Sequence, residues 1–325
     1  MIRRITIALV VWALGTPAIG LPAPGVDIYL LADASIELPE ALKVPLVRLD
    51  LQEKPWIPFD AVKYYDWSSH VMMLTSPPKW GKVALRGTPF VVVAGGERCY
   101  LGALWTMESS FAPESSVVLI QKFDGAFFHP NALRLSLHKI FRHGAEADSP
   151  SPFKDPRLDP RIRRALEKSG KLRLGIECTL DEVQVVPRPG GSTARYTFTV
   201  KNLEGDPLYV LDPDRLGTES FHYMTNGIVF APKAPSQDSP VSPSMTGFTR
   251  KPEAPVIDAL SLLRPGASMR RTLELPVYST IKPGAYDALF WFRSVPLPEK
   301  DREKIKEGRV WIGMVETKRE MAVKG

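Results

Sequence analysis

An alternating segment near the middle of the chain constrains the fold most strongly. In residues 194–201, apolar and polar side chains alternate strictly, and Tyr196, Phe198 and Val200 fall on one side. Because successive side chains of a strand point to opposite faces, this pattern predicts a half-buried β-strand. Turn signals rich in proline and glycine lie at 189–191 and 205–207. They favour chain reversal at both ends of the strand.

The same arrangement of strand and turn extends over residues 172–292. Pro-Gly turns precede two further strand candidates, at 268–277 and 285–292. Short strands separated by such turns predict an antiparallel sandwich. The motifs Leu263-Arg-Pro-Gly266 and Pro283-Gly-Ala-Tyr286 resemble those of immunoglobulin-like sandwiches in exported bacterial proteins. This resemblance covers about the C-terminal third and implies a fold only, because such sandwiches host many functions.

The first half of the chain predicts a module of helices and strands. Two apolar runs, 87–94 and 98–105, flank Gly95-Gly96-Glu97, which is typical of a β-hairpin. We expect further strands at 27–32, 70–75, 117–120 and 133–137, and helical turns at 39–42 and 58–63. The predicted fold class is therefore an α+β N-terminal module followed by an all-β immunoglobulin-like sandwich.

A second resemblance, to uncharacterised exported bacterial proteins, covers about 65 residues of the first module and implies no activity. It rests on residues 60–66, His70, Leu74-Thr75, 87–93, Tyr100-Leu-Gly102 and Ser109-Ser110.

The N-terminus has the form of a secretory signal peptide. Arg3 and Arg4 precede an apolar run at 5–14, and Ala18 and Gly20 suit the cleavage positions, which predicts cleavage after Gly20. The apolar run has about 10–15 residues, fewer than the roughly 20 that span a bilayer. An uncleaved membrane anchor is the alternative. We expect a periplasmic or secreted protein with no transmembrane span after cleavage.

Charge and length complete this organisation. The formal net charge is +6 and falls by two when Arg3 and Arg4 are removed, which is too small an excess to argue for nucleic acid. The predicted parts are a signal peptide (1–20), the α+β module (21–145), a linker with a basic helix (146–171), the sandwich (172–296) and a charged extension (297–325). Within the extension we expect a strand at 309–315 and a frayed end at 318–325. Within the sandwich we expect a mobile loop at 231–255, rich in proline and serine.

The linker helix offers a candidate binding surface. Asp159 followed by Pro160 predicts a capped helix start, and Gly170 predicts its end. Arg161, Arg164 and Lys168 have the spacing of one helix face. Such a face suits an envelope protein or an anionic envelope polymer, whereas a merely solvated face is the alternative.

The two cysteines, Cys99 and Cys178, leave two alternatives open. In an oxidising compartment they form a disulfide between the modules. Otherwise they are two separate buried thiols, because free cysteine packs like a small apolar residue.

Catalytic and metal-binding patterns are weak. Asp66, Ser68 and His70 supply an acid, a hydroxyl and an imidazole, which makes an envelope hydrolase the alternative function, but they also suit a capped turn. His129, His138 and His143 lack typical zinc spacing. Asp206, Asp212 and Asp214 are a calcium alternative to ordinary turn residues.

The function predicted from these observations is non-enzymatic binding or scaffolding in the bacterial envelope. We expect no metal, and we expect no cofactor because the sequence has neither a phosphate-binding glycine loop nor a dinucleotide fingerprint.

Overall fold

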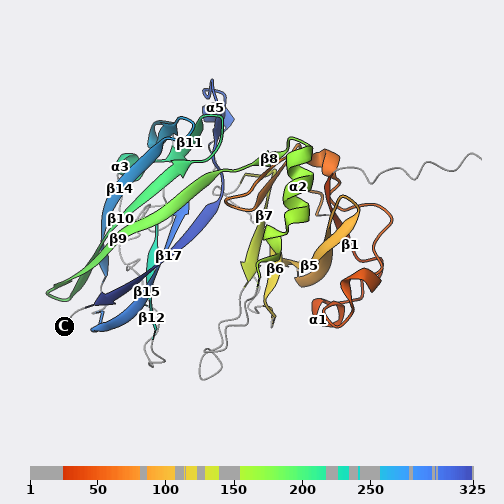
Figure 1. Cartoon of the computed structure of the whole chain (residues 1–325), viewed down its shortest axis with the longest axis horizontal. Helices are drawn as coiled ribbons and strands as arrows, with labels where there is room; N and C mark the ends of the chain where they lie inside the picture. Colours follow the sequence, from red (N-terminus) through yellow and green to blue (C-terminus); the bar gives the residue numbers. More distant parts are fainter. Residues whose placement is uncertain are drawn as a thin grey trace, which may run out of the picture.

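The computed structural model describes residues 25–80, 86–106, 113, 115–122, 129–138, 154–216, 226–233, 241, 257–277, 281–294, 297 and 299–323. Across these residues the protein is mostly β, with few and short helices. Figure 1 shows two lobes joined by the segment that leads from β8 (Leu172–Arg173) into β9 (Ile176–Arg188). We call residues 25–173 the N-terminal module and residues 174–323 the C-terminal module.

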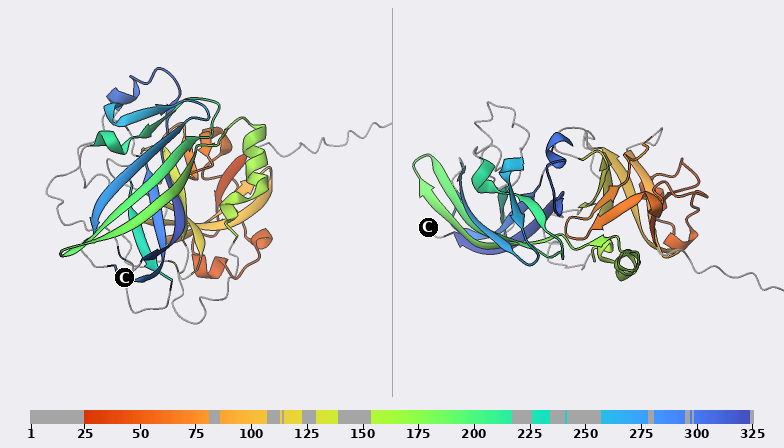
Figure 2. Two further views of the ribbon diagram at one scale, coloured as in Figure 1. Left: turned by 60° about the vertical axis from the view of Figure 1, so that its left-hand side comes forward. Right: turned by 90° about the horizontal axis from the view of Figure 1, so that it is seen from above.

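A single curled sheet of eight strands forms the N-terminal module (Figure 2). Its order is β1 (Val26–Leu30), β4 (Arg86–Ala94), β5 (Glu97–Thr106), β6 (Val117–Lys122), β7 (Ala132–His138), β3 (Val71–Leu74), β2 (Val62–Asp66) and β8. The sheet is mixed, because β5 with β6 and β2 with β8 are parallel, whereas the other neighbours are antiparallel.

The predicted hairpin is present as β4 and β5. Gly95 and Gly96 form its turn with φ angles of 58° and 82°, which glycine adopts without strain. Ala94 pairs with Glu97 across this turn. The other strands predicted in this half of the chain are confirmed as β1, β3, β6 and β7.

Helix α2 (Pro160–Lys168) belongs to this module's core. The Asp159 carboxylate accepts a hydrogen bond from the Arg161 amide at 2.8 Å, which confirms the predicted helix start. Ile162, Ala165 and Leu166 are buried among the inward-facing residues of the sheet. The helix predicted within the linker therefore packs its apolar stripe into the N-terminal core. The other helical segments here are α1 (Leu38–Ala41) and 3-10 turns at Leu46–Arg48, Phe59–Ala61 and Pro156–Leu158.

Three sheets of three strands form the C-terminal module. The first contains β14 (Ser268–Val277), β10 (Gly191–Asn202) and β9. The second contains β12 (Ile228–Pro232), β15 (Gly284–Arg293) and β17 (Met314–Val323). The third contains β13 (Leu260–Leu263), β11 (Leu208–Leu211) and β16 (Arg309–Val310). All pairs are antiparallel except β11 with β16. Its short helices are α3 (Pro213–Leu216), α5 (Glu299–Arg302) and a 3-10 turn at Ile257–Ala259.

The core of this module lies between the first two sheets. Tyr196, Phe198 and Val200 are fully buried, as the alternation predicted. Phe290 of β15 packs against Phe198, with 4.7 Å between ring centroids. The predicted antiparallel pairing of this region is thus present in the first two sheets, which have the longest strands.

Two predicted boundaries differ from the structure. Leu172–Arg173, predicted to begin the sandwich, pairs with β2 in the N-terminal sheet. The region predicted as a charged extension contributes β16 and β17, and β17 pairs with β15 as far as Val323. The frayed end predicted at 318–325 is therefore wrong through Val323, because β15 supplies a hydrogen-bonding partner far away in sequence.

Several predictions concern residues outside those described. They are the signal peptide at 1–20, Ser109-Ser110, His143 and most of the loop at 231–255. Among the described residues, no helix has both the length and the apolar character needed to cross a membrane.

Candidate functional site

The turn between β2 and β3 carries the candidate catalytic residues, and it lies where the two modules meet. Asp66 is fully buried at the end of β2. One of its carboxylate oxygens accepts hydrogen bonds from the Ser68 hydroxyl at 2.7 Å, the Ser69 amide at 3.1 Å and the Ser69 hydroxyl at 3.0 Å. This is the geometry of an acid that caps a turn.

Ser68 is bonded on every side. Its hydroxyl donates to Asp66 and accepts from the Ile176 amide at 3.1 Å and from the Trp311 indole at 3.2 Å. A hydroxyl has one hydrogen to donate and two lone pairs, so this set uses its full capacity. Gly175 allows the close approach, because a Cβ there would lie 2.1 Å from the Ser68 oxygen. Ser68 therefore joins the modules in this structure.

Arg309 of β16 completes the junction. Its guanidinium lies 2.5 Å from the second oxygen of Asp66 and also pairs with Glu204 of the C-terminal module. The Tyr64 ring lies 4.8 Å from the guanidinium carbon. Although burial opposes the charge of Arg309, the two carboxylates hold its pKa above the ordinary value. One cation thus binds an acid from each module.

His70 is separated from this bonding. Its Nδ1 atom lies 3.0 Å from the Tyr65 hydroxyl, its ring packs edge-on against Trp67, and the residue is 8% exposed. Among the described contacts, neither Asp66 nor Ser68 bonds His70. In the described contacts, the three candidate residues therefore do not form the relay of acid, base and nucleophile that a Ser-His-Asp hydrolase uses.

Burial also changes the acidity of His70. It lowers the pKa of the imidazole well below the usual 6.5, and nearby Arg157 lowers it further. The backbone at His70 has a positive φ angle of 52°, which is uncommon for a residue other than glycine. A neutral ring in a constrained turn fits a structural role in the N-terminal core.

We expect the His70→Asn variant to be less sensitive to acid than the natural chain. Because the folded pKa is depressed, the unfolded chain binds one more proton below about pH 6.5. This lowers the free energy of unfolding by at most about 1.4 kcal/mol per pH unit as the pH falls. Asparagine does not titrate and tolerates the positive φ. Urea denaturation between about pH 6.5 and 4 measures the two slopes, and parallel curves would contradict the prediction.

The predicted basic face of α2 is divided in the structure. Arg161 pairs with Asp159 at 2.7 Å and with Glu97 at 3.3 Å. Arg164 and Lys168 are exposed, and neither forms an ion pair with any described residue. Among the residues that the structure describes, two of the three cations are therefore exposed and have no ion-pair partner.

The cysteines are free thiols, and the disulfide is not formed. Cys99 of β5 packs against the N-terminal core, whereas Cys178 of β9 packs against the C-terminal core. Burial raises the pKa of Cys99 to about 11 and that of Cys178 to about 12. The alternative of two separate thiols describes them, except that both side chains are partly buried instead of fully buried.

Two of the three acids in the calcium alternative form ion pairs, whereas Asp206 is exposed. Asp212 pairs with Arg271 at 2.7 Å, and Asp214 pairs with the same guanidinium at 2.9 Å. Within the described ranges, no group of three or more His, Cys, Asp or Glu side chains is arranged to hold a metal ion. Asp212 serves instead to fasten α3 to β14.

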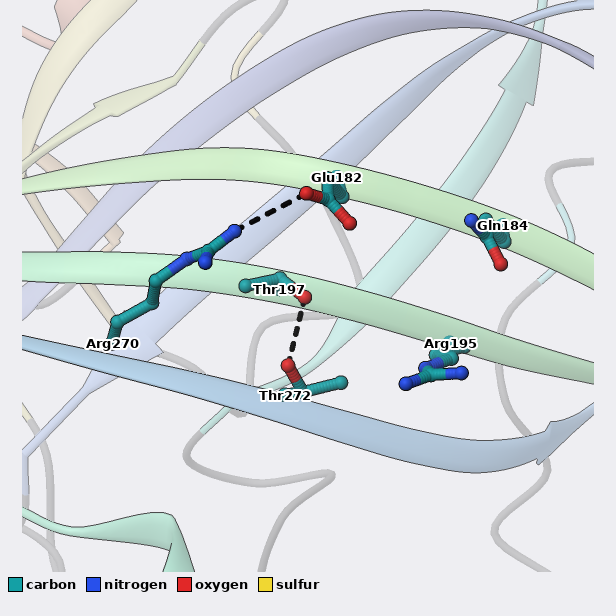
Figure 3. Close-up of a pocket in the computed structure, with 6 residues that line it drawn as sticks. All are labelled: Glu182, Gln184, Arg195, Thr197, Arg270 and Thr272. Atoms are coloured by element: carbon teal, nitrogen blue, oxygen red, sulfur yellow. Dashed lines mark hydrogen bonds and ion pairs between the residues drawn. The ribbon is translucent and has the colours of Figure 1, made fainter.

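A polar hollow on the outer face of the β14-β10-β9 sheet was not anticipated from the sequence (Figure 3). The polar half of the alternation in β10 contributes Arg195 and Thr197 to its lining. Alternation alone marks these positions as facing solvent, and only the pairing with β9 and β14 shows which side chains surround them.

Comparisons with known proteins give a distant likeness. No protein-family model and no curated protein matches the chain. A crystal structure of a Bordetella pertussis protein assigned as ApaA is 13% identical, with a TM-score of 0.21, over 46% of this chain and 94% of that one. An uncharacterised structural-genomics target solved by X-ray crystallography is 12% identical, with a TM-score of 0.20, over 46% of this chain and 86% of that one.

Proposed function

We propose that this chain is a non-enzymatic binding protein of the bacterial envelope, periplasmic or secreted, and that it holds an anionic envelope polymer on the exposed face of α2. The observation that carries the proposal is the division of that helix. Its apolar stripe is fixed in the core, whereas Arg164 and Lys168 are exposed and without an ion-pair partner among the described residues.

Fixed cations suit a polymer with repeated negative charge. The helix is held by Ile162, Ala165 and Leu166, so little conformational freedom is lost there on binding. Its neighbours add to the positive field, because residues 154–173 contain eight Lys or Arg and three Asp or Glu. Such a field attracts polyanions and is screened by salt.

We also infer that the C-terminal module is an immunoglobulin-like sandwich. Two antiparallel sheets enclose its aromatic core. The Tyr286 hydroxyl donates to the Lys282 carbonyl oxygen at 2.9 Å, four residues upstream in the Pro-Gly turn. A tyrosine bonded in this way to the preceding corner is typical of these sandwiches.

The hydrolase alternative has less support from the described contacts. The bonds of Asp66 and Ser68 link the modules, and His70 bonds Tyr65 instead of either residue.

Charge reversal tests the proposed surface. We expect Arg164→Glu with Lys168→Glu to weaken binding of the mature chain to isolated envelope fragments and to dextran sulfate by about tenfold or more at low salt, since each cation near an anionic surface is worth about 1 kcal/mol. The matched control is Arg188→Glu with Lys201→Glu, which makes the same charge change at exposed positions of the C-terminal module.

The outcomes separate three explanations. Weaker binding in the α2 variant alone supports the proposal, provided that the difference from the natural chain disappears at high salt. Equal loss in both variants would show that only the net charge matters. Chemical crosslinking in the envelope adds a further arm: capture of one protein partner through α2, with polymer binding unchanged, would replace the polymer by an acidic envelope protein.

A further inference from the structure

The polar hollow in the C-terminal module has a volume of about 270 Å³. Figure 3 shows that its side chains come from three adjacent strands. They are Glu182 and Gln184 of β9, Arg195 and Thr197 of β10, and Arg270 and Thr272 of β14. Every one of these side chains is polar.

Strand register explains the hollow. Thr197 lies between Glu182 on one side and Thr272 on the other. The two threonine hydroxyls bond each other at 2.8 Å, which keeps both short side chains close to the sheet. Longer side chains surround the two threonines. Arg195 lies two residues before Thr197 on β10, and Arg270 lies two residues before Thr272 on β14. The space over the threonine pair is therefore open.

The charges around the hollow have both signs. Arg270 pairs with Asp181 at 3.4 Å and with Glu182 at 3.2 Å. Arg195 pairs with Glu274 at 3.5 Å. Both arginines and all three carboxylates are thus already in ion pairs, so none of these five charged groups is left without a partner around the hollow. This distinguishes it from the exposed face of α2.

The ion pairs are also easily rearranged. The side chains of Arg195 and Arg270 are 57% and 61% exposed, and pairs at such positions contribute little to stability. Each partner can exchange part of its pairing for hydrogen bonds to a bound molecule. The guanidinium groups offer donors, the carboxylates offer acceptors, and Gln184 offers both.

We propose that this hollow binds one neutral sugar unit of a glycan. A pyranose ring carries hydroxyls that donate and accept, and no net charge, which matches the mixed lining. The volume is below the roughly 300–1,000 Å³ typical of sites for drug-sized ligands, which suits a single ring. Because no lining side chain is apolar, little hydrophobic stabilisation is gained, and we expect a Kd of about 1 mM. The proposal does not rest on the function assigned to α2.

Titration with two neutral tetrasaccharides, maltotetraose and tetra-N-acetylchitotetraose, tests the site. In NMR spectra of the full mature chain, we expect chemical shifts to change as one of the two sugars is added and to reach saturation. Replacing both threonines, Thr197→Val with Thr272→Val, keeps side-chain shape and removes both hydroxyls, and should weaken binding about fivefold or more. Thr272→Phe should abolish binding, because the larger side chain fills the hollow.

The matched control lies on the same face of the sheet. Glu177 and Lys201 pair in register beyond the hollow, and both are exposed. Glu177→Gln with Lys201→Gln should leave sugar binding unchanged, as should the α2 charge reversal. Thermal unfolding of each variant verifies that it is folded. The proposal would be overturned if neither sugar bound at about 20 mM, well above the expected Kd, or if the control weakened binding as much as the threonine variants.

Discussion

Replacing Arg309 with methionine should lower the free energy of unfolding by about 3–5 kcal/mol. Arg309 is the cation between two buried carboxylates, Asp66 of the N-terminal module and Glu204 of the C-terminal module. Its removal leaves both negative charges buried without a counter-charge, which is far less favourable than the original cluster. Because these acids come from different modules, the two modules should also lose cooperativity and unfold in separate steps. Urea denaturation at neutral pH, followed by fluorescence and circular dichroism, measures both effects.

Arg270→Met provides a matched control for this prediction. Arg270 also pairs with two carboxylates, but its side chain is largely exposed, so its loss should cost less than about 1 kcal/mol. A rescue variant adds a second check: Arg309→Met combined with Asp66→Asn and Glu204→Gln leaves no charge unpaired and should recover part of the loss. Similar losses for Arg309→Met and Arg270→Met, with no rescue, would contradict the assigned role of the cluster.

Phe290→Ala should destabilise the C-terminal module by about 3–5 kcal/mol. The Phe290 ring is fully buried between the two larger sheets, with centroid distances of 4.7 Å to Phe198 and 5.6 Å to Tyr196. Removing it loses apolar burial and leaves a cavity that the surrounding close-packed side chains fill poorly. The midpoint of urea unfolding, with the slope unchanged, measures this loss.

Val186→Ala serves as the control for the core substitution. Val186 lies in β9 and is 44% exposed, so its truncation should change the free energy of unfolding by less than about 0.5 kcal/mol. A loss at Phe290 as small as that at Val186 would show that the aromatic cluster does not hold the sheets together.

Local physical rules determined much of the secondary structure from sequence. The alternation around Tyr196 predicted β10, and the Gly95-Gly96 pair predicted the hairpin turn between β4 and β5. Asp159 and Pro160 predicted the start of α2. Each of these signals acts within a few residues, through side-chain direction, backbone freedom or a nearby hydrogen bond, so the sequence alone carries it.

Tertiary structure decided the roles of the candidate site residues. Asp66, Ser68 and His70 are close together in sequence, and these residue types are compatible with either a catalytic group or a capped turn. Arg309, 243 residues beyond Asp66, selects the capped turn by pairing with it. No local pattern reports a partner that far along the chain.

Long-range pairing likewise decided the strand order, the strand at the C-terminal end and the polar hollow. Taken alone, the charged residues of β17 predict a solvated tail. In the structure this segment is a strand, because β15 forms hydrogen bonds along its length. Taken alone, the threonines of β10 and β14 predict only an exposed face. The strand register places Thr197 beside Thr272 and so forms the floor of the hollow. The sequence by itself determined which segments form strands and which faces are apolar, because those depend on neighbouring residues. Only the fold determined which side chains meet, because that depends on how the whole core packs.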